Sequence, residues 1–162
     1  MDICGVKVSR KIVEFREATR EDALFIADNL RKADRDEVAA MGATCRMAVE
    51  GSRQMSDYAW TGLINGVPAM LFGCGAPLVS QGGEVWALGT DLCSTAPREM
   101  LVYGRKLIRM MLEIYPELQN YCDARYHAAH RWLKKLGFTV GPAEPRGPNG
   151  ELFCKISIRK EI

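Results

Sequence analysis

The sequence has few metal-binding groups and no long apolar run. Its 162 residues include two histidines and six cysteines, and the cysteines lie singly, without the paired spacing of a zinc site. We therefore expect reduced thiols and no metal centre. No apolar stretch approaches the roughly 20 residues that span a bilayer, so we expect no membrane association.

An excess of one charge is also missing. The sequence has 22 Lys and Arg against 20 Asp and Glu, a formal net charge of +2, which gives no electrostatic basis for nucleic-acid binding. The first ten residues lack the basic-then-apolar order of a signal peptide, so we expect a cytoplasmic protein. The 48% apolar content predicts one globular domain over residues 1–162.

Hydrophobic patterning predicts alternating strands and helices, punctuated by clear turn signals. Thr19 is a helix cap, Asn65-Gly66 is a hairpin turn, and Gly137 is a left-handed helix end. The pattern predicts strands over 12–15, 58–64, 67–72, 84–91, 118–122, 138–140 and 152–158, and helices over 19–30, 37–42, 45–49, 94–115 and 126–136. This order predicts an α/β fold with a twisted, mixed sheet of six or seven strands and helices on both faces.

The longest predicted helix has one apolar face. Leu101, Ile108 and Met111 recur on that face, and Pro97 suits the first turn. Gly104 lies in the middle of the helix, where glycine costs about 1 kcal/mol relative to alanine. We therefore expect this turn of the helix to touch the sheet closely.

The segment from His127 to Val140 resembles the last helix of the GCN5-related N-acetyltransferase (GNAT) fold, which often ends in Lys-x-Gly-Phe before a strand. The order of elements matches that fold along nearly the whole chain. The resemblance implies acyl transfer from acetyl-CoA to an amine of a small molecule or a protein. Many family members carry a catalytic Tyr in this helix, whereas the present sequence has Leu133.

The resemblance also implies where the cofactor binds. The thioester carbonyl meets a main-chain N–H at the end of the strand before the long helix, and the pyrophosphate meets the turn that follows. That turn is rich in glycine in most members, but has no glycine here and loses one N–H at Pro97. Alternatively, its hydroxyls only cap the helix and its Arg is a surface residue. The residues assigned to the cofactor are Leu88, Gly89, Thr90, Cys93, Ser94, Thr95 and Arg98.

Acyl transfer to an amine needs a proton acceptor and a proton donor. Glu84 and Asp91, at opposite ends of the strand before the long helix, are the candidate bases. The leaving thiolate takes its proton from water, from Tyr121 or from Tyr126.

Histidine and cysteine side chains offer alternatives for the chemistry. His127 and His130 are acid–base candidates or simply surface residues of a helix. Cys93 or Cys122 would allow a covalent acyl-enzyme with His127 as activator, although buried, inert thiols are the simpler interpretation.

A second resemblance carries a different class of function. The segments Gly66–Met70, Val85-Trp86, Arg98–Ile108, Asn120-Tyr121 and Arg131–Gly137 are similar to a GNAT-like family of internal virion or assembly proteins from T7-like tailed bacteriophages. That resemblance implies a catalytically degenerate protein that binds phage or host proteins, in the virion or the host cytoplasm. Whether the chain also forms a homodimer stays open.

The two hypotheses predict different clefts. An enzyme requires an open V-shaped cleft between the strand that ends at Thr90 and the strand that ends at Cys122. A binding module predicts a filled or narrow cleft and an exposed apolar patch.

Overall fold

The computed structural model describes residues 11–76 and 82–161. The first ten residues, which include Cys4 and on which the expectation about a signal peptide rests, lie outside the described residues. The elements are β1 (Val13–Glu17), α1 (Arg20–Asp28), α2 (Lys32–Ala40), α3 (Cys45–Met55), β2 (Tyr58–Ile64), β3 (Val67–Gly75), β4 (Gly83–Gly89), α4 (Pro97–Ile114), β5 (Glu117–Asp123), α5 (His127–Leu136), β6 (Thr139–Pro145) and β7 (Leu152–Arg159).

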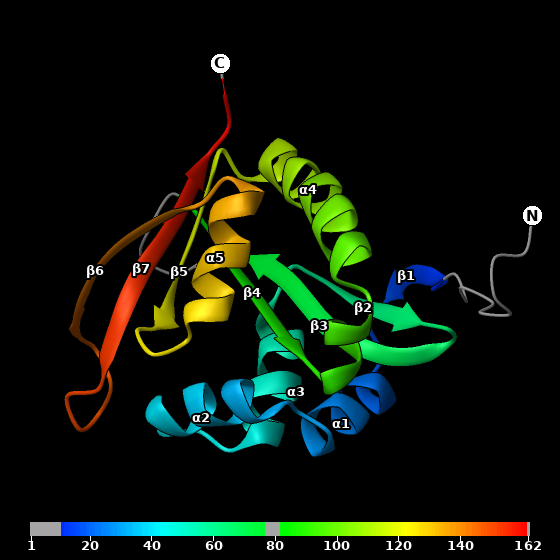
Figure 1. The fold of residues 1–162 in the computed structure, drawn as a ribbon, viewed down its shortest axis with the longest axis horizontal. Helices are drawn as coiled ribbons and strands as arrows, with labels where there is room; N and C mark the ends of the chain where they lie inside the picture. Colours follow the sequence, from blue (N-terminus) through cyan, green and yellow to red (C-terminus); the bar gives the residue numbers. More distant parts are fainter. Residues whose placement is uncertain (1–10, 77–81, 162) are drawn as a thin grey trace, which may run out of the picture.

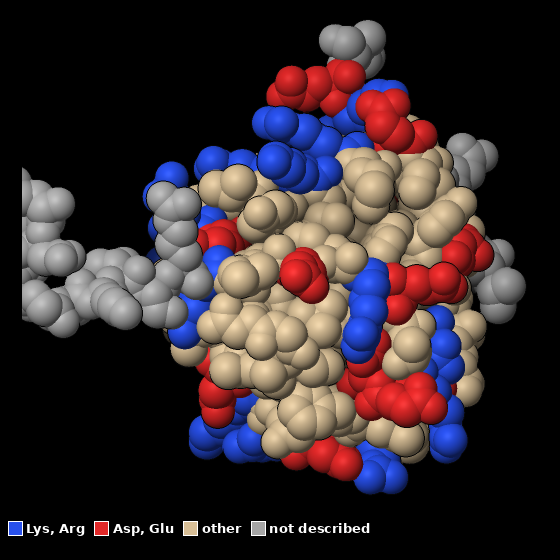
Figure 2. Space-filling view, turned by 90° about the vertical axis from the view of Figure 1, so that its right-hand side faces the viewer, with Lys and Arg blue, Asp and Glu red and all other residues tan. Residues whose placement is uncertain are grey.

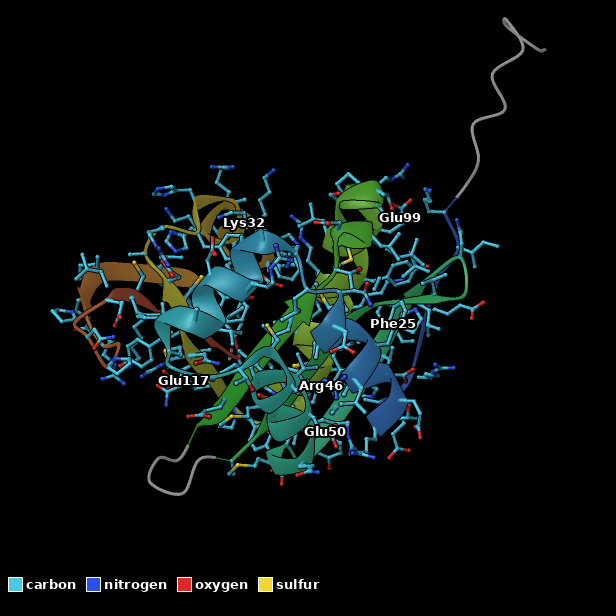
Figure 3. All side chains as sticks on the ribbon, turned by 90° about the horizontal axis from the view of Figure 1, so that it is seen from below. Phe25, Lys32, Arg46, Glu50, Glu99 and Glu117 are labelled. Carbon is cyan, nitrogen blue, oxygen red and sulfur yellow. The ribbon has the colours of Figure 1, made fainter. Side chains whose placement is uncertain are left out.

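The strands form one mixed sheet in the order β1-β2-β3-β4-β5-β7-β6. β4 and β5 run parallel, and every other neighbouring pair is antiparallel. Helices α4 and α5 cover one face, and α1, α2 and α3 cover the other (Figure 1). Figure 3 looks onto the second layer, with Phe25 on α1, Lys32 on α2 and Arg46 on α3 labelled. The predicted α/β architecture is confirmed.

Local turn chemistry sets the ends of several elements, as the sequence predicted. The Thr19 hydroxyl accepts the Asp22 N–H at 3.1 Å, and the Asp22 carboxylate accepts the Thr19 N–H at 3.3 Å, which completes a capping box. Asn65 and Gly66 have φ angles of 50° and 79°, the left-handed pair that a tight hairpin requires. Gly137 ends α5 with a φ of 106°.

Several predictions about helices and strands need correction. Helix α2 begins at Lys32 rather than at residue 37, and helix α4 begins at Pro97 rather than at residue 94. Helix α3 continues to Met55, and β6 continues to Pro145 on an exposed edge, where proline costs no ladder hydrogen bond. Gly104 faces α5 rather than the sheet, because a Cβ atom there would lie 3.0 Å from Leu136 Cδ2 and 3.5 Å from Trp132 Cζ2. The glycine therefore permits close packing of the two helices.

Two hydrophobic clusters hold the layers to the sheet. The cluster on the α4 side includes Phe72 of β3 and Met111 of α4, and the cluster on the α1 side includes Leu71 of β3 and Ile26 of α1. Adjacent β3 residues thus serve opposite faces, because side chains alternate along a strand. Each face of the sheet is buried by its own helical layer.

The surface at the β1 edge mixes both signs of charge. Figure 2 shows Lys and Arg interspersed with Asp and Glu around a broad uncharged area on this face. This face therefore lacks the one-sign field typical of nucleic-acid binding.

No helix within residues 11–76 and 82–161 combines the length and apolarity needed to cross a membrane.

Replacing Asp22 with Ala should destabilise the fold by about 2–3 kcal/mol, because Arg16 and Thr61 lose a buried, charged partner at 2.7 Å each and the α1 cap is broken. Asp28→Ala is the matched control, since Asp28 also pairs with an arginine, Arg46, but at the surface. Urea unfolding of both variants measures the difference. Equal losses in the two variants would contradict the assignment of Asp22 as a buried anchor.

Candidate functional site

Strands β4 and β5 separate along most of their length. They pair only at Gly83↔Leu118 and Glu84↔Gln119, although β4 continues to Gly89 and β5 to Asp123. This is the V-shaped opening that the enzyme hypothesis requires.

The Asn120 side chain occupies the narrow end of the opening. Its Nδ2 donates to the Val85 carbonyl at 2.7 Å, and its Oδ1 accepts the Tyr121 N–H at 2.7 Å. A side-chain amide thus takes over from the main-chain ladder at the point where the two strands diverge.

Two carboxylates of α2 hold the open ends of the strands. Asp34 Oδ2 accepts the Gly89 N–H of β4 at 2.7 Å and the Arg31 Nε at 3.0 Å. Glu37 Oε2 accepts the Asp123 N–H of β5 at 2.8 Å. Because these residues are three apart on one helix, α2 fixes both arms of the V.

These carboxylates belong to a cluster of titratable groups. Burial, with a further contribution from Asp34, raises the pKa of Glu37. Burial and the Asp34 charge also raise the pKa of the Tyr126 phenol, which donates a hydrogen bond to Asp34. The Arg31 guanidinium lies 5.8 Å from the centre of the Tyr126 ring. Glu37 is therefore a stronger base, and Tyr126 a weaker acid, than either side chain in water.

The edge of β4 that faces the opening presents main-chain groups. The Val85 carbonyl and the Gly89 N–H both point to this edge, and the Thr90 N–H points the other way, to the Ala69 carbonyl at 2.8 Å. Because N–H groups alternate along a strand, the Ala87 N–H points into the opening.

The amides expected from the sequence to hold a carbonyl are therefore already engaged. Gly89 donates to Asp34, Thr90 donates to Ala69, and the alternation turns the Leu88 N–H toward β3. The N–H that the structure leaves facing the opening is that of Ala87, one residue before the predicted set Leu88, Gly89 and Thr90.

A pocket of about 220 Å³ lies at the wide end of the opening, between the first turn of α4 and helix α5. Its wall is mainly apolar, with Arg31, Ser94 and Tyr126 as its polar members. Four residues discussed in the sequence analysis line this pocket, namely Cys93, Ser94, Tyr126 and Leu133. Arg31, which the sequence did not indicate, also lines it. The lining residues are Arg31, Met70, Cys93, Ser94, Pro97, Met100, Tyr126, Ala128, Ala129, Trp132 and Leu133.

The turn before α4 is a 3₁₀ turn, Asp91–Thr95. The Ser94 hydroxyl donates to the Asp91 carbonyl at 2.7 Å, and the Thr95 hydroxyl donates to the Leu92 carbonyl at 2.6 Å. Both hydroxyls therefore bond to their own turn rather than cap α4.

Helix α4 begins at Pro97, and no side chain caps it. The main-chain N–H groups of Arg98 and Glu99 belong to its first turn, whereas the Met100 N–H already donates to the Ala96 carbonyl at 3.0 Å. Together with the positive end of the helix dipole and the exposed Arg98 side chain, they can receive an anion. Glu99 marks this end of α4 in Figure 3.

The remaining candidates lie at different distances from the opening. Glu84 lies at the narrow, paired end, and Asp91 lies just beyond the end of β4. The Tyr121 ring is covered by Arg146, whose guanidinium is 3.8 Å from the ring centre. Tyr126, which lines the pocket, is therefore the better placed tyrosine.

Cysteine and histidine give no support to a covalent intermediate or a metal. The Cys93 Sγ donates to the Ala69 carbonyl at 3.2 Å, and burial raises the pKa of both Cys93 and Cys122, which favours inert thiols. His130 Nε2 lies 2.9 Å from the Asp123 carbonyl oxygen. In the described part of the chain, no three His, Cys, Asp or Glu side chains are grouped as metal ligands would be.

Comparisons with known proteins identify the fold. No family model matches the sequence, and no curated protein sequence matches it. YncA from Salmonella typhimurium, solved with its cofactor acetyl-CoA, is 14% identical, with 93% of this chain and 95% of that chain covered at a TM-score of 0.65. The aminoglycoside acetyltransferase AAC(6')-Ib with coenzyme A is 17% identical, with 92% and 95% covered at 0.62. An acetyltransferase of the GNAT family from Streptococcus pneumoniae is 15% identical, with 93% and 100% covered at 0.59.

The raised pKa of Glu37 predicts how Glu37→Gln changes stability with pH. The unfolded chain releases this proton at a lower pH than the folded chain, so ionisation of Glu37 lowers the free energy of unfolding as pH rises above the usual Glu pKa. The Gln variant should therefore gain stability relative to the parent as the pH rises above the usual Glu pKa, as measured by urea unfolding at a series of pH values.

Glu50→Gln is the matched control, with the opposite sign. Hydrogen bonds from Arg53 lower the pKa of Glu50, so that variant should lose stability relative to the parent as pH rises. Parallel pH dependence in the two variants would contradict the assigned environment of Glu37.

Proposed function

Because the chain has the fold of GNAT acetyltransferases and an open β4 edge beside a helix N-terminus, we propose that it transfers an acyl group from acyl-CoA to an amine. The amine nitrogen attacks the thioester carbonyl carbon, a C–N bond forms, and the C–S bond breaks. The amine loses a proton to a base, and the CoA thiolate gains one. The observation that carries the proposal is the separation of β4 and β5 beyond Glu84.

The proposed site uses the main chain for most of its binding. The Ala87 N–H holds the thioester oxygen and stabilises the negative charge that develops there. The N–H groups of Arg98 and Glu99, with the Arg98 side chain, hold the pyrophosphate. The pantetheine arm occupies the pocket between α4 and α5, where Leu133 offers an apolar contact.

Proton transfer is the part of the reaction for which this chain is less well equipped. Of the bases expected from the sequence, Asp91 lies nearer the open end than Glu84 does. Glu37 is the base that we favour, because its raised pKa suits general-base catalysis and its carboxylate lies at the end of β5. Tyr126 is the proton donor at the pocket, and its raised pKa predicts slow turnover.

Leu133 and the 3₁₀ turn favour a second candidate function. A Leu at the position of the usual Tyr and hydroxyls that bond to their own turn suit a catalytically degenerate GNAT-fold protein that acts by binding other proteins. This alternative is the one implied by the resemblance to bacteriophage assembly proteins. In it, the pocket between α4 and α5 binds no CoA.

Arg98→Ala should weaken CoA binding roughly tenfold at low salt, because a charge-assisted phosphate contact is lost. Arg109→Ala is the matched control, since Arg109 is also exposed and lies on the same helix, toward the opposite end. Calorimetric titration with CoA measures both affinities. The control should bind as the parent does.

Equal losses in the two variants would remove Arg98 from the site and point to a general charge effect. A parent protein that binds no CoA and transfers no acetyl group to a panel of amines would contradict the enzyme proposal and leave the binding role.

A further inference from the structure

A second, wholly apolar cavity opens behind the proposed CoA pocket. It has a volume of about 60 Å³ and lies between α4 and the sheet, and none of its lining residues is charged. Three residues, Met70, Met100 and Trp132, line both this cavity and the pocket between α4 and α5. The cavity therefore lies directly beside the place where the thioester end of CoA would lie.

Three aromatic rings form part of the cavity wall. Phe15 packs edge-on against Phe72, with ring centres 5.8 Å apart, and against Tyr103, with ring centres 5.4 Å apart. All three rings line the cavity. Such ring contacts give this part of the wall a defined shape.

The strand edge leads from the expected position of the carbonyl to this cavity. Val85 lines the cavity, and Ala87 packs against the hydrophobic cluster on the α4 side. A thioester whose oxygen is held by the Ala87 N–H would thus have its acyl chain next to the apolar floor formed by Met70 and Phe72.

Trp132 has a buried polar group beside both cavities. Its indole Nε1 is buried and has no hydrogen-bond partner within residues 11–76 and 82–161. A buried, unpaired donor destabilises a structure, and Trp132 lies where the pocket and the cavity meet.

We propose that the cavity beneath α4 binds the acyl chain of an acyl-CoA longer than acetyl-CoA. This inference rests on the proposed acyltransferase function and names its donor. A volume of about 60 Å³ holds roughly four to six water-sized groups, and a methylene group is of similar size. The chain is therefore a short linear one, such as butanoyl or hexanoyl.

A calorimetric series of CoA, acetyl-CoA, butanoyl-CoA, hexanoyl-CoA and dodecanoyl-CoA with the parent protein tests the proposal. Each methylene that enters an apolar site strengthens binding about fourfold. Butanoyl-CoA should therefore bind at least tenfold more tightly than acetyl-CoA. The gain should continue to hexanoyl-CoA and stop before dodecanoyl-CoA, because a volume of about 60 Å³ cannot hold the longer chain.

A cavity-filling variant adds a direct test of place. Leu107 lines the cavity but not the CoA pocket. Leu107→Phe should reduce the affinity for hexanoyl-CoA to that for acetyl-CoA and leave the affinity for acetyl-CoA unchanged. Leu107→Met, which nearly conserves volume, should behave as the parent does.

The outcomes separate this inference from the function on which it rests. Failure of every ligand, including CoA, to bind the parent would overturn the proposed function. Binding of CoA with equal affinity for acetyl-CoA and hexanoyl-CoA would overturn the acyl-chain site alone. A preference for hexanoyl-CoA that survives Leu107→Phe in a folded variant would place the chain elsewhere and also overturn it.

Discussion

The hydrogen bonds from α2 to the ends of β4 and β5 are the constraint on which the site depends. Strands that separate inside a sheet leave main-chain groups without partners, which is costly in the interior. Here Asn120 bonds at the narrow end, Asp34 holds the Gly89 N–H, and Glu37 holds the Asp123 N–H. Without these side chains the opening would lose the contacts that keep its edges apart, and the exposed β4 edge between them would not persist.

A site built mainly on backbone N–H groups makes few demands on side chains. The proposed contacts of the thioester and the pyrophosphate require the strand edge at Ala87 and the start of α4, which the fold supplies. The proposed site therefore tolerates Leu133 in place of the usual Tyr and the lack of glycine in the turn before α4. Catalytic proton transfer, in contrast, needs particular side chains, and there the chain departs furthest from the pattern that it resembles.

The sequence predicted the elements well because their signals are local. The Thr19 cap, the Asn65-Gly66 turn and the Gly137 cap each act through neighbouring residues. Tertiary partners were harder to predict, as Gly104 shows. A glycine in the middle of a helix indicates close packing, but it does not indicate whether the neighbour is α5 or the sheet. The carboxylates of α2 were missed because a charged helix usually indicates a solvated face. Asp34 and Val38 share one face, and only the burial of both reveals that α2 turns a carboxylate inward.

In the proposed site, a CoA thioester lies on the open edge of β4 and at the start of α4. Titration of the ¹⁵N-labelled protein with acetyl-CoA, followed through the backbone amide resonances, tests it most directly. The proposed site predicts the largest shifts at the amides of Ala87, Arg98 and Glu99, with smaller changes along the side of α5 that bears Leu133. Shifts confined to other parts of the chain, or no shifts at saturating ligand, would contradict it.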